Sequence, residues 1–262
     1  MFQFCSLFSG SSGNCSLAQT NTTKILIDAG ESAKKIANSL ESMQIDPSCI
    51  NAILITHEHS DHVKGLGTLS KKYNIPVYAN KETWEAMDSQ REKINEDNIK
   101  LFTFEKFNIG DIEIKPFSIP HDAANPCGFN LFHENKKMSI ATDIGHINKD
   151  VISHLANSSF LLIEANYEPE ILKYSPYPYL LKERIKGPNG HLSNIDAGKT
   201  ISYLSNYGLK NVMLGHLSNE NNFPELAYKT VVENLIENNV NENNLRLSVA
   251  NRYTPSEIID VS

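Results

Sequence analysis

Short apolar runs that end at polar, turn-forming residues dominate the first quarter of the chain. Residues 2–8, 14–20 and 24–27 form three such runs, and Gly, Ser, Asn or Asp follows each of them. Residues 52–56 (AILIT) form a fourth run, which leads into a His-rich loop. Runs of this length predict short β-strands, each followed by a turn or a loop.

Between these runs, the spacing of apolar residues changes to that of a helix. In the stretch from residue 31 to 43, Ala33, Ile36, Ala37 and Leu40 fall on one helical face. The other elements that we expect in this half are helices at residues 63–73 and 81–88 and a strand at residues 76–79.

The second half of the chain repeats the order of strands first and helices afterwards. Its expected strands are residues 100–104, 112–118, 127–132, 138–142, 160–165, 211–214 and 245–250, and its expected helices are residues 151–156, 196–206 and 225–238. This order predicts an α/β (α+β) fold in which two β-sheets pack together with helices outside, a four-layer αββα sandwich. The irregular residues 169–188 are expected to form an inserted loop near a functional site.

The composition is that of an ordinary globular protein. The chain has 262 residues, of which 40% are hydrophobic and 21% are charged, and this balance does not indicate disorder. At roughly 150 residues per domain, the length allows one large domain or two small ones. Because residues 169–188 are interpreted as an inserted loop and not as a linker, we assign residues 1–262 to one domain.

Charge and cysteine content narrow the classes of function. With 24 Lys+Arg against 31 Asp+Glu, the formal net charge is −7, so binding to nucleic acid would need a local basic patch. The four cysteines, Cys5, Cys15, Cys49 and Cys127, form no CxxC pair, which argues against a thiolate zinc site. Without an apolar run of 18 residues or a secretory leader, we expect a cytoplasmic protein with no membrane segment. The oligomeric state stays open.

The sharpest chemical signal is the segment THEHSDH at residues 56–62, directly after an expected strand. His57 and His59 alternate to the same side of an extended chain, so they can share one metal ion. Asp61 and His62 follow the turn and can reach a second ion. Imidazole and carboxylate ligands suit zinc, manganese or iron, so the sequence leaves the choice among these metals open.

This HxHxDH pattern at the end of a strand resembles that of the metallo-β-lactamase fold hydrolases. The resemblance implies further ligands at later strand ends, and His121, Asp143 and His216 stand there in the expected order. It also implies two divalent cations, the first held by His57, His59 and His121, the second by Asp61, His62 and His216, with Asp143 bridging them. We expect Asp122, Thr142 or Glu164 to orient the ligand histidines.

Other segments resemble the YycJ/VicX (WalJ) branch of these hydrolases. They are FCSLFSGSSGNC at residues 4–15, LIEAN at 162–166, YP with LKERI at 177–185, GHLSN at 190–194 and GHLSNENN at 215–222. The resemblance covers most of the chain. The branch is similar to phosphodiesterases of tRNA processing and phosphonate metabolism, and it implies nuclease activity, DNA exonuclease in particular.

His191 is the main candidate outside the implied metal shell. In phosphodiesterases that this chain resembles, a histidine in such a segment faces the phosphate, where it can protonate the leaving oxygen or stabilise the transition state. The alternative is a structural place beside the helix that begins near Ser193 or Asn194. His146 is expected at the surface or behind the ligands.

The remaining candidates concern the substrate. The Ser/Gly-rich residues 9–13 are either a hairpin turn or a wall of the substrate cleft, with Asn14 as the residue of interest. Lys182, Arg184 and Lys186 form either a solvated face or a basic rim beside the phosphate. We take Asn14, Asn166, Arg184, Ser193 and Asn194 as candidate substrate-binding residues.

These observations predict a hydrolase that uses two metal ions and acts on phosphodiester bonds, with DNA as the expected substrate. Asp61 and His191 are its candidate catalytic residues. Two alternatives remain: a thioester hydrolase of the glyoxalase II type, and a regulatory metal-binding protein with little turnover. A thioesterase would need a glutathione pocket that nothing in the sequence demands.

Overall fold

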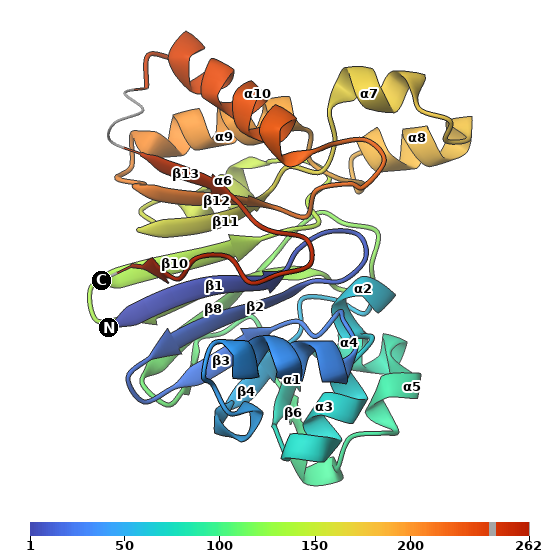
Figure 1. The fold of residues 1–262 in the computed structure, drawn as a ribbon, viewed down its shortest axis with the longest axis vertical. Helices are drawn as coiled ribbons and strands as arrows, with labels where there is room; N and C mark the ends of the chain where they lie inside the picture. The colour runs from blue at the N-terminus through green and yellow to red at the C-terminus, as the bar shows by residue number, and fades with distance from the viewer. Residues whose placement is uncertain (241–244, 262) are drawn as a thin grey trace.

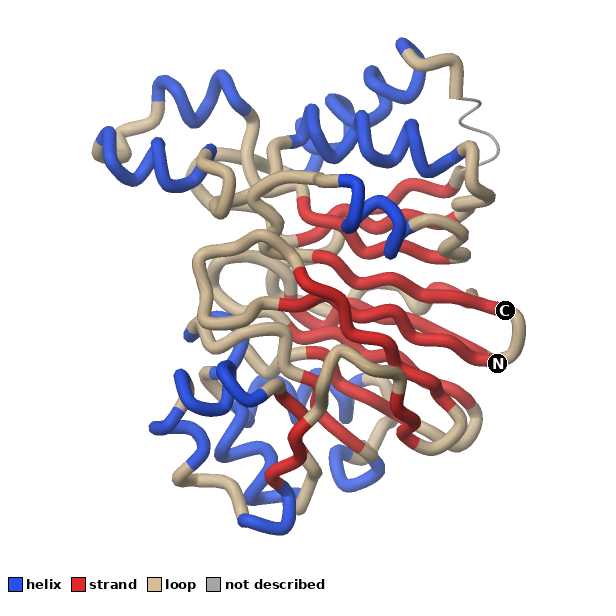
Figure 2. The backbone as a smooth tube through the Cα atoms, turned by 180° about the vertical axis from the view of Figure 1, so that it is seen from behind, coloured by secondary structure: helices blue, strands red, loops and turns tan. Residues whose placement is uncertain are grey.

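The computed structural model describes residues 1–240 and 245–261. In this part of the chain, two seven-stranded sheets face each other at the centre, and helices cover the outer face of each sheet (Figure 1). The predicted αββα sandwich is therefore confirmed. Both chain ends lie at one edge of the sheets, as the reverse view also shows (Figure 2).

The first sheet joins the start of the chain to its end. Its strands β1, β2 and β3 are antiparallel, whereas β3 to β6 run parallel to one another. In spatial order the strands are β14 (Ile259–Asp260), β1 (Phe2–Phe8), β2 (Cys15–Thr20), β3 (Lys24–Ile27), β4 (Ala52–Leu54), β5 (Val77–Ala79) and β6 (Ile99–Leu101).

The second sheet is built in the same mixed way. Its strands β10 to β13 are parallel, whereas β7 to β10 alternate in direction. In spatial order they are β13 (Arg246–Val249), β12 (Asn211–Gly215), β11 (Phe160–Glu164), β10 (Lys136–Ala141), β9 (Cys127–His133), β8 (Ile112–Ser118) and β7 (Phe107–Ile109).

The helices divide between the two outer faces. Those of the first half are α1 (Ala33–Ser42), η1 (Pro47–Cys49), α2 (Ser60–Val63), α3 (Leu66–Tyr73), α4 (Lys81–Ala86), α5 (Asp88–Arg91) and η2 (Glu96–Asn98). Those of the second half are α6 (Lys149–Leu155), α7 (Pro169–Tyr174), α8 (Tyr179–Lys186), α9 (Asn194–Ser205) and α10 (Pro224–Glu237). Among the described residues, no helix combines the length and the apolar character that crossing a membrane requires.

Two sequence predictions need correction. The single helix expected over residues 63–73 is two helices, because the chain turns at Gly65, where an added Cβ would lie 2.1 Å from the Glu31 carbonyl oxygen. The loop expected over residues 169–188 instead contains α7 and α8. Proline at the first position of α7 suits a helix start, and local packing supplies what the weak periodicity did not show.

Alternating apolar residues build separate cores on the two faces of each sheet. In β3, Ile25 and Ile27 point into the core between the sheets, whereas Leu26 packs with the helices. Phe4 and Phe160 meet across the sheets with ring centroids 4.5 Å apart. This packing fixes how one sheet lies on the other, and therefore how their strand ends face each other.

The strand ends that carry polar side chains gather on one side of the molecule. Helices α2, α7 and α8 lie on the same side, opposite the chain ends (Figure 1). Asp28, Asp143 and His216 each follow a strand and have positive φ, at 62°, 58° and 54°. This left-handed backbone is uncommon outside glycine, and Asp, Asn and His are the residues that adopt it most readily. It turns the chain sharply where each side chain enters the site.

Candidate metal centre

Three histidines form the first group of possible ligands. His57 and His59 lie in the loop after β4, and His121 follows β8. Nδ1 of His59 lies 3.1 Å from Nε2 of His57 and 3.3 Å from Nε2 of His121. Two nitrogens bound at about 2.0–2.1 Å to one tetrahedral ion would be about 3.3 Å apart. The three rings therefore have the spacing of ligands around a common cation.

A second group lies beside the first. Oδ2 of Asp61 is 3.4 Å from Nε2 of His216 and 3.6 Å from Nε2 of His62. Asp61 comes from the first sheet's side of the sandwich, and His216 follows β12 in the second sheet. The site is therefore assembled across the junction of the two sheets.

Asp143 stands between the two groups. Its Oδ2 lies 3.2 Å from Nε2 of His62, and its Oδ1 lies 3.8 Å from Nε2 of His121. The carboxylate is 2% exposed, and within the described residues Oδ2 has no hydrogen-bond partner. A buried carboxylate oxygen without a donor is costly unless a positive charge faces it. The orphaned oxygen and the surrounding nitrogen donors fit bound cations.

Three of the candidate ligand histidines are each oriented through the Nδ1 atom. Nδ1 of His62 donates to Asp28 at 2.8 Å, and Nδ1 of His216 donates to Glu164 at 2.8 Å. Nδ1 of His121 donates to the Gly190 carbonyl oxygen at 3.0 Å. These acceptors place the proton on Nδ1 and leave the lone pair of Nε2 facing the site, the arrangement common around protein-bound metals.

Asp28 is the site residue that our sequence reasoning missed. It also accepts hydrogen bonds from the Thr56 amide and hydroxyl groups, so it holds the start of the His-rich loop. A signal was available, because Asp28 directly follows the apolar run at residues 24–27, as His57 follows its own strand. Two of the residues that we expected to orient ligands lie next to candidate ligands. Glu164 accepts the hydrogen bond of His216. Oδ1 of Asp122 lies 3.5 Å from Nε2 of His121.

Glu164 is the most connected carboxylate of the site. It is fully buried, and its Oε1 lies 2.8 Å from Nδ1 of both His191 and His216. Its Oε2 accepts the backbone amides of Ile144 and Leu192 at 2.8 and 3.1 Å. These four donors hold the charged carboxylate in place. Burial acts to raise the Glu164 pKa, but the charges and hydrogen bonds of His191 and His216 outweigh it and keep that pKa lowered.

The electrostatics separate the histidines into two kinds. Burial and neighbouring imidazoles hold the pKa of His57 well below its usual value. This ring is therefore neutral and can offer a nitrogen lone pair to a cation. Burial also acts on His191, but the charge and hydrogen bond of Glu164 outweigh it and raise the His191 pKa. Because Glu164 occupies Nδ1 of His191, a protonated His191 presents its Nε2 proton as the remaining donor.

Of the predicted substrate-binding residues, Asn14, Asn166 and Arg184 lie at or near the donor groups. Asn14 lies in the site, with Nδ2 3.2 Å from Nε2 of His62 and 3.5 Å from Oδ2 of Asp61. Asn166 supports the site from behind, since its Nδ2 donates to the His216 carbonyl oxygen at 2.9 Å. Arg184 is exposed and donates to Asp122, next to His121.

The other two are engaged inside the protein. Ser193 caps α9 by accepting the Asp196 amide at 3.1 Å. Asn194 is fully buried and donates to Glu168 and Asn222. Both side chains therefore have partners inside the protein, and contact of either one with substrate stays a prediction. His146 lies outside the donor groups and pairs with the Pro188 carbonyl oxygen.

Cysteine plays no part in this donor set. All four cysteines are free thiols, and the candidate groups consist of His, Asp and Glu alone. Cys5, Cys15 and Cys127 are buried, whereas Cys49 is exposed. The candidate centre is therefore a nitrogen and oxygen site.

Comparison with known proteins places the chain among metallo-β-lactamase fold proteins. The family model for the beta-lactamase superfamily domain matches residues 23–217. Exodeoxyribonuclease WalJ of Streptococcus pneumoniae is 40% identical over 237 residues, which cover 89% of this chain and 88% of that protein. Exodeoxyribonuclease YycJ of Bacillus anthracis is 36% identical over 235 residues, 89% of each chain.

A solved structure extends the likeness of the fold. The short form of human tRNase Z superimposes with a TM-score of 0.69 over 99% of both chains, at 16% sequence identity. At that identity the match concerns the fold alone. It agrees with the αββα arrangement of two central sheets described above.

Proposed function

Because the chain belongs to the beta-lactamase superfamily and, within it, to the family of the WalJ and YycJ proteins, we propose that it is a metal-dependent phosphodiesterase that degrades DNA from a strand end. The observation that carries this proposal is the buried Asp143 carboxylate, whose Oδ2 has no hydrogen-bond partner among the described residues. Six candidate ligands lie around it: His57, His59, Asp61, His62, His121 and His216. A donor set that holds two divalent cations can support the hydrolysis of phosphodiesters.

Seven side chains would hold two cations. His57, His59 and His121 would bind one, Asp61, His62 and His216 would bind the other, and Asp143 would contact both. Nitrogen and oxygen donors without a thiolate suit zinc or manganese, and also iron. When bound, such cations supply an activated water molecule at neutral pH and neutralise charge on the phosphoryl oxygens.

The residues of the chain divide the remaining work. Asp61, at the mouth of the site, orients the attacking water and accepts its hydrogen bond. His191 donates its Nε2 proton to the leaving oxygen or to a phosphoryl oxygen, while Glu164 holds the ring and stabilises its positive charge. Asn14 and Arg184 contact the substrate at two edges of the site.

Metal analysis and three substrates test the proposal. We expect two divalent ions per chain in metal-replete protein, turnover of bis(p-nitrophenyl) phosphate, and shortening of end-labelled DNA. Labels at the 5′ or the 3′ end report the polarity. Thioester turnover without phosphodiester turnover would favour the glyoxalase-type alternative, and bound metal with neither activity would favour a regulatory protein.

A further inference from the structure

Helices α7 and α8 form an arm that stands out from the sandwich (Figures 1 and 2). The arm has a small apolar core of its own, in which Tyr167, Leu172 and Ile185 are buried and Tyr177 and Leu181 pack against them. This core holds the two helices together without help from either sheet. The arm is therefore a preformed part of the surface.

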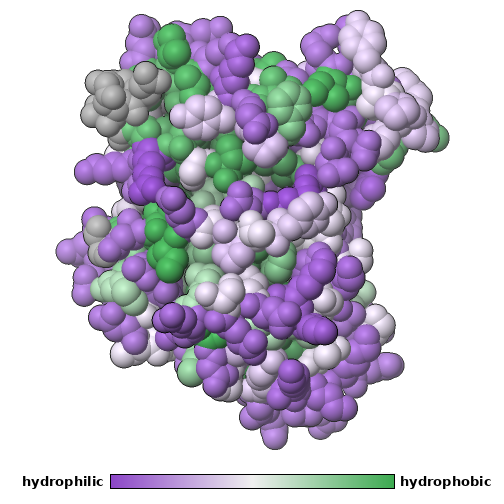
Figure 3. Space-filling view, viewed as in Figure 1, coloured by the Kyte–Doolittle hydropathy of each residue, from purple (hydrophilic) through white to green (hydrophobic). Residues whose placement is uncertain are grey.

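The arm exposes several large side chains. Tyr174 is 76% exposed, Tyr179 is 72% exposed and Leu180 is 80% exposed. Four of the ten tyrosines of the chain, at positions 167, 174, 177 and 179, lie in this short segment. In Figure 3 the arm is the separate lobe at upper right, where pale and green side chains stand among purple ones. Exposed aromatic rings in one place indicate a binding surface.

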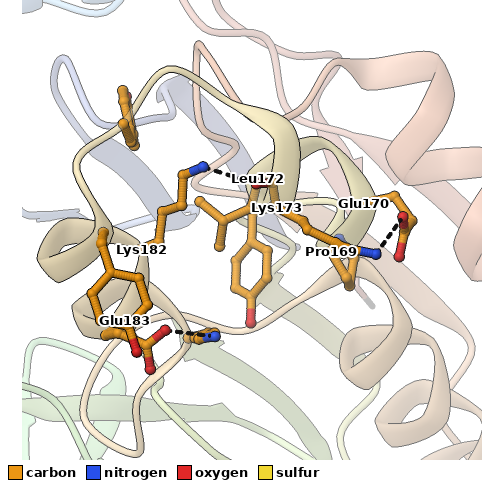
Figure 4. A pocket seen from close by; sticks show the side chains of 10 residues that line it. Pro169, Glu170, Leu172, Lys173, Lys182 and Glu183 are labelled. Atoms are coloured by element: carbon orange, nitrogen blue, oxygen red, sulfur yellow. Dashed lines mark hydrogen bonds and ion pairs between the residues drawn. The ribbon is translucent and has the colours of Figure 1, made fainter.

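A cavity of about 580 Å³ opens between the two helices, with tyrosines and lysines in its wall. Its size is within the range of pockets that hold a small ligand. Tyr167, Tyr177 and Tyr179 contribute rings, and Lys173, Lys182 and Lys186 contribute charge. Figure 4 shows Lys182 extending toward α7, where its Nζ donates to the Lys173 carbonyl oxygen at 2.8 Å.

The lysines of this cavity are available for a phosphate. Lys173 pairs with Glu170 at 3.5 Å and Lys186 pairs with Glu183 at 2.7 Å, but both pairs are solvent-exposed. Exposed ion pairs of this kind contribute little and exchange readily. Among the described residues, no carboxylate forms an ion pair with Lys182. The cavity thus combines stacking rings with cations, whereas the whole chain carries a charge of −7.

The arm is joined directly to the candidate site at both of its ends. It begins at Tyr167, whose backbone pairs with Ser193, and it ends where the His191 amide donates to the Ile185 carbonyl oxygen at 2.8 Å. Arg184 of α8 is bonded to Asp122, beside His121. A strand with one phosphate at His191 would therefore have its next nucleotides near the arm.

We infer that the cavity between α7 and α8 is a subsite for single-stranded DNA, in which a base stacks on Tyr179 and Lys182 contacts the adjoining phosphate. This inference rests on the proposed function. Stacking on tyrosine accepts any base, since every base has a π-face, and so suits an enzyme that shortens DNA of any sequence. The subsite explains how an acidic protein binds a polyanion.

Binding and turnover measurements with three variants test the subsite. The probe is a fluorescent 12-nucleotide single strand with phosphorothioate linkages, titrated into metal-replete protein at several salt concentrations. Tyr179→Ala should raise Kd about 5- to 100-fold, the usual effect of losing one stacked base. Lys182→Gln should instead lower the slope of log Kd against log salt by about 0.7, the value for one phosphate contact. Tyr203→Ala, an exposed tyrosine on α9, is the matched control.

Turnover separates this inference from the proposed function. Tyr179→Ala should lower kcat/KM for the 12-nucleotide DNA relative to kcat/KM for bis(p-nitrophenyl) phosphate, because only the longer substrate reaches the arm. If the wild type hydrolyses both substrates but Tyr179→Ala and Lys182→Gln bind and cut DNA like the control, the subsite is refuted and the function stands. That outcome would point to a protein partner for the arm. If the wild type hydrolyses neither, the function fails, while the binding titration still decides the subsite.

Discussion

His191 and His216 share a single carboxylate oxygen, since Oε1 of Glu164 lies 2.8 Å from the Nδ1 atom of each ring. One ring belongs to the proposed proton donor and the other to a proposed metal ligand. The two histidines stand in identical five-residue segments, GHLSN at 190–194 and GHLSN at 215–219. A common acceptor therefore couples the acid chemistry to the metal site, and substitutions can separate the two roles.

Replacing each histidine in turn should give two different outcomes. His191→Ala should keep both metal ions and lower kcat by about 10²- to 10⁴-fold, the range for losing a positioned acid or base. The deficit should be smaller for bis(p-nitrophenyl) phosphate than for DNA, because p-nitrophenolate leaves without protonation. His216→Ala should lose metal and activity together on both substrates.

Metal content, melting temperature and both turnover rates decide between these roles. An equal loss on both substrates in His191→Ala would make His191 a phosphate binder and not a general acid. Loss of metal in His191→Ala would show that the two segments have exchanged roles. Normal turnover with a slightly lower melting temperature would leave His191 with a structural role alone.

Glu164→Gln should shift the pH dependence of the reaction. The negative charge of Glu164 raises the pKa of His191 against the effect of burial, so its removal lowers that pKa. A general acid must be protonated, and the alkaline limb of the kcat/KM profile should therefore move to lower pH. Both oxygens of Glu164 accept hydrogen bonds, so the NH₂ group of glutamine would face a hydrogen-bond donor in either orientation. The melting temperature should therefore fall. An unchanged alkaline limb in folded, metal-loaded protein would contradict this role.

Asp28→Asn should weaken metal binding although it replaces no proposed ligand. Asp28 accepts from Nδ1 of His62 and from the Thr56 amide, and an amide oxygen is a weaker acceptor with no charge. Loss of such a supporting carboxylate commonly lowers metal affinity by about 10- to 100-fold. Competition with a chelator measures the affinity. Asn166→Ala, which removes a support of His216 on the other sheet, is a useful comparison.

Removing the thiols should leave the metal content unchanged. The candidate groups contain no sulfur, so a variant with Ala at positions 5, 15, 49 and 127 should bind as much metal as the wild type. Its melting temperature should fall, because the first, second and last of these side chains are buried. Cys49→Ser alone, at an exposed position, should change neither property. Metal lost from the folded quadruple variant would argue for a thiolate ligand.

Asp111 should make the fold sensitive to acid in a narrow range. Its carboxylate accepts the Thr20 hydroxyl at 2.8 Å, which joins the β7–β8 turn to the end of β2. Desolvation acts to raise the pKa of Asp111. Hydrogen bonds from Thr23, Thr20 and Thr22 outweigh it and lower this pKa to about 2.

The sign of the effect follows from this lowered pKa. In the unfolded chain the pKa is about 3.9, so the ionised group stabilises the fold above about pH 4 and loses this contribution as the pH falls toward 2. Asp111→Asn should melt a few degrees below wild type at pH 7, and the gap should close by about pH 2. Glu237→Gln, an exposed change at the end of α10, should show no such convergence. A gap that stays constant from pH 7 to pH 2 would refute the proposed role of the carboxylate.

The local pattern of the sequence determined the layers and the donor residues. Runs such as 24–27 and 112–118 are strands because their apolar side chains recur with a period of two or fill both faces of a buried sheet. HxHxDH was recognisable because four donors lie within six residues. The later donors His121, Asp143 and His216 were expected because the resemblance to the metallo-β-lactamase fold hydrolases implied ligands at later strand ends.

Tertiary structure decided which histidine each supporting carboxylate contacts and what the irregular segment becomes. Asp28 reaches His62 across 34 positions, and Glu164 reaches His216 across 52, so no local pattern announces either pair. Residues 169–188 fold into α7 and α8 because Leu172 and Ile185, far apart in sequence for such short helices, bury each other with Tyr167. Neither helix has enough periodicity to predict this, since its stability comes from the contact and not from its own sequence.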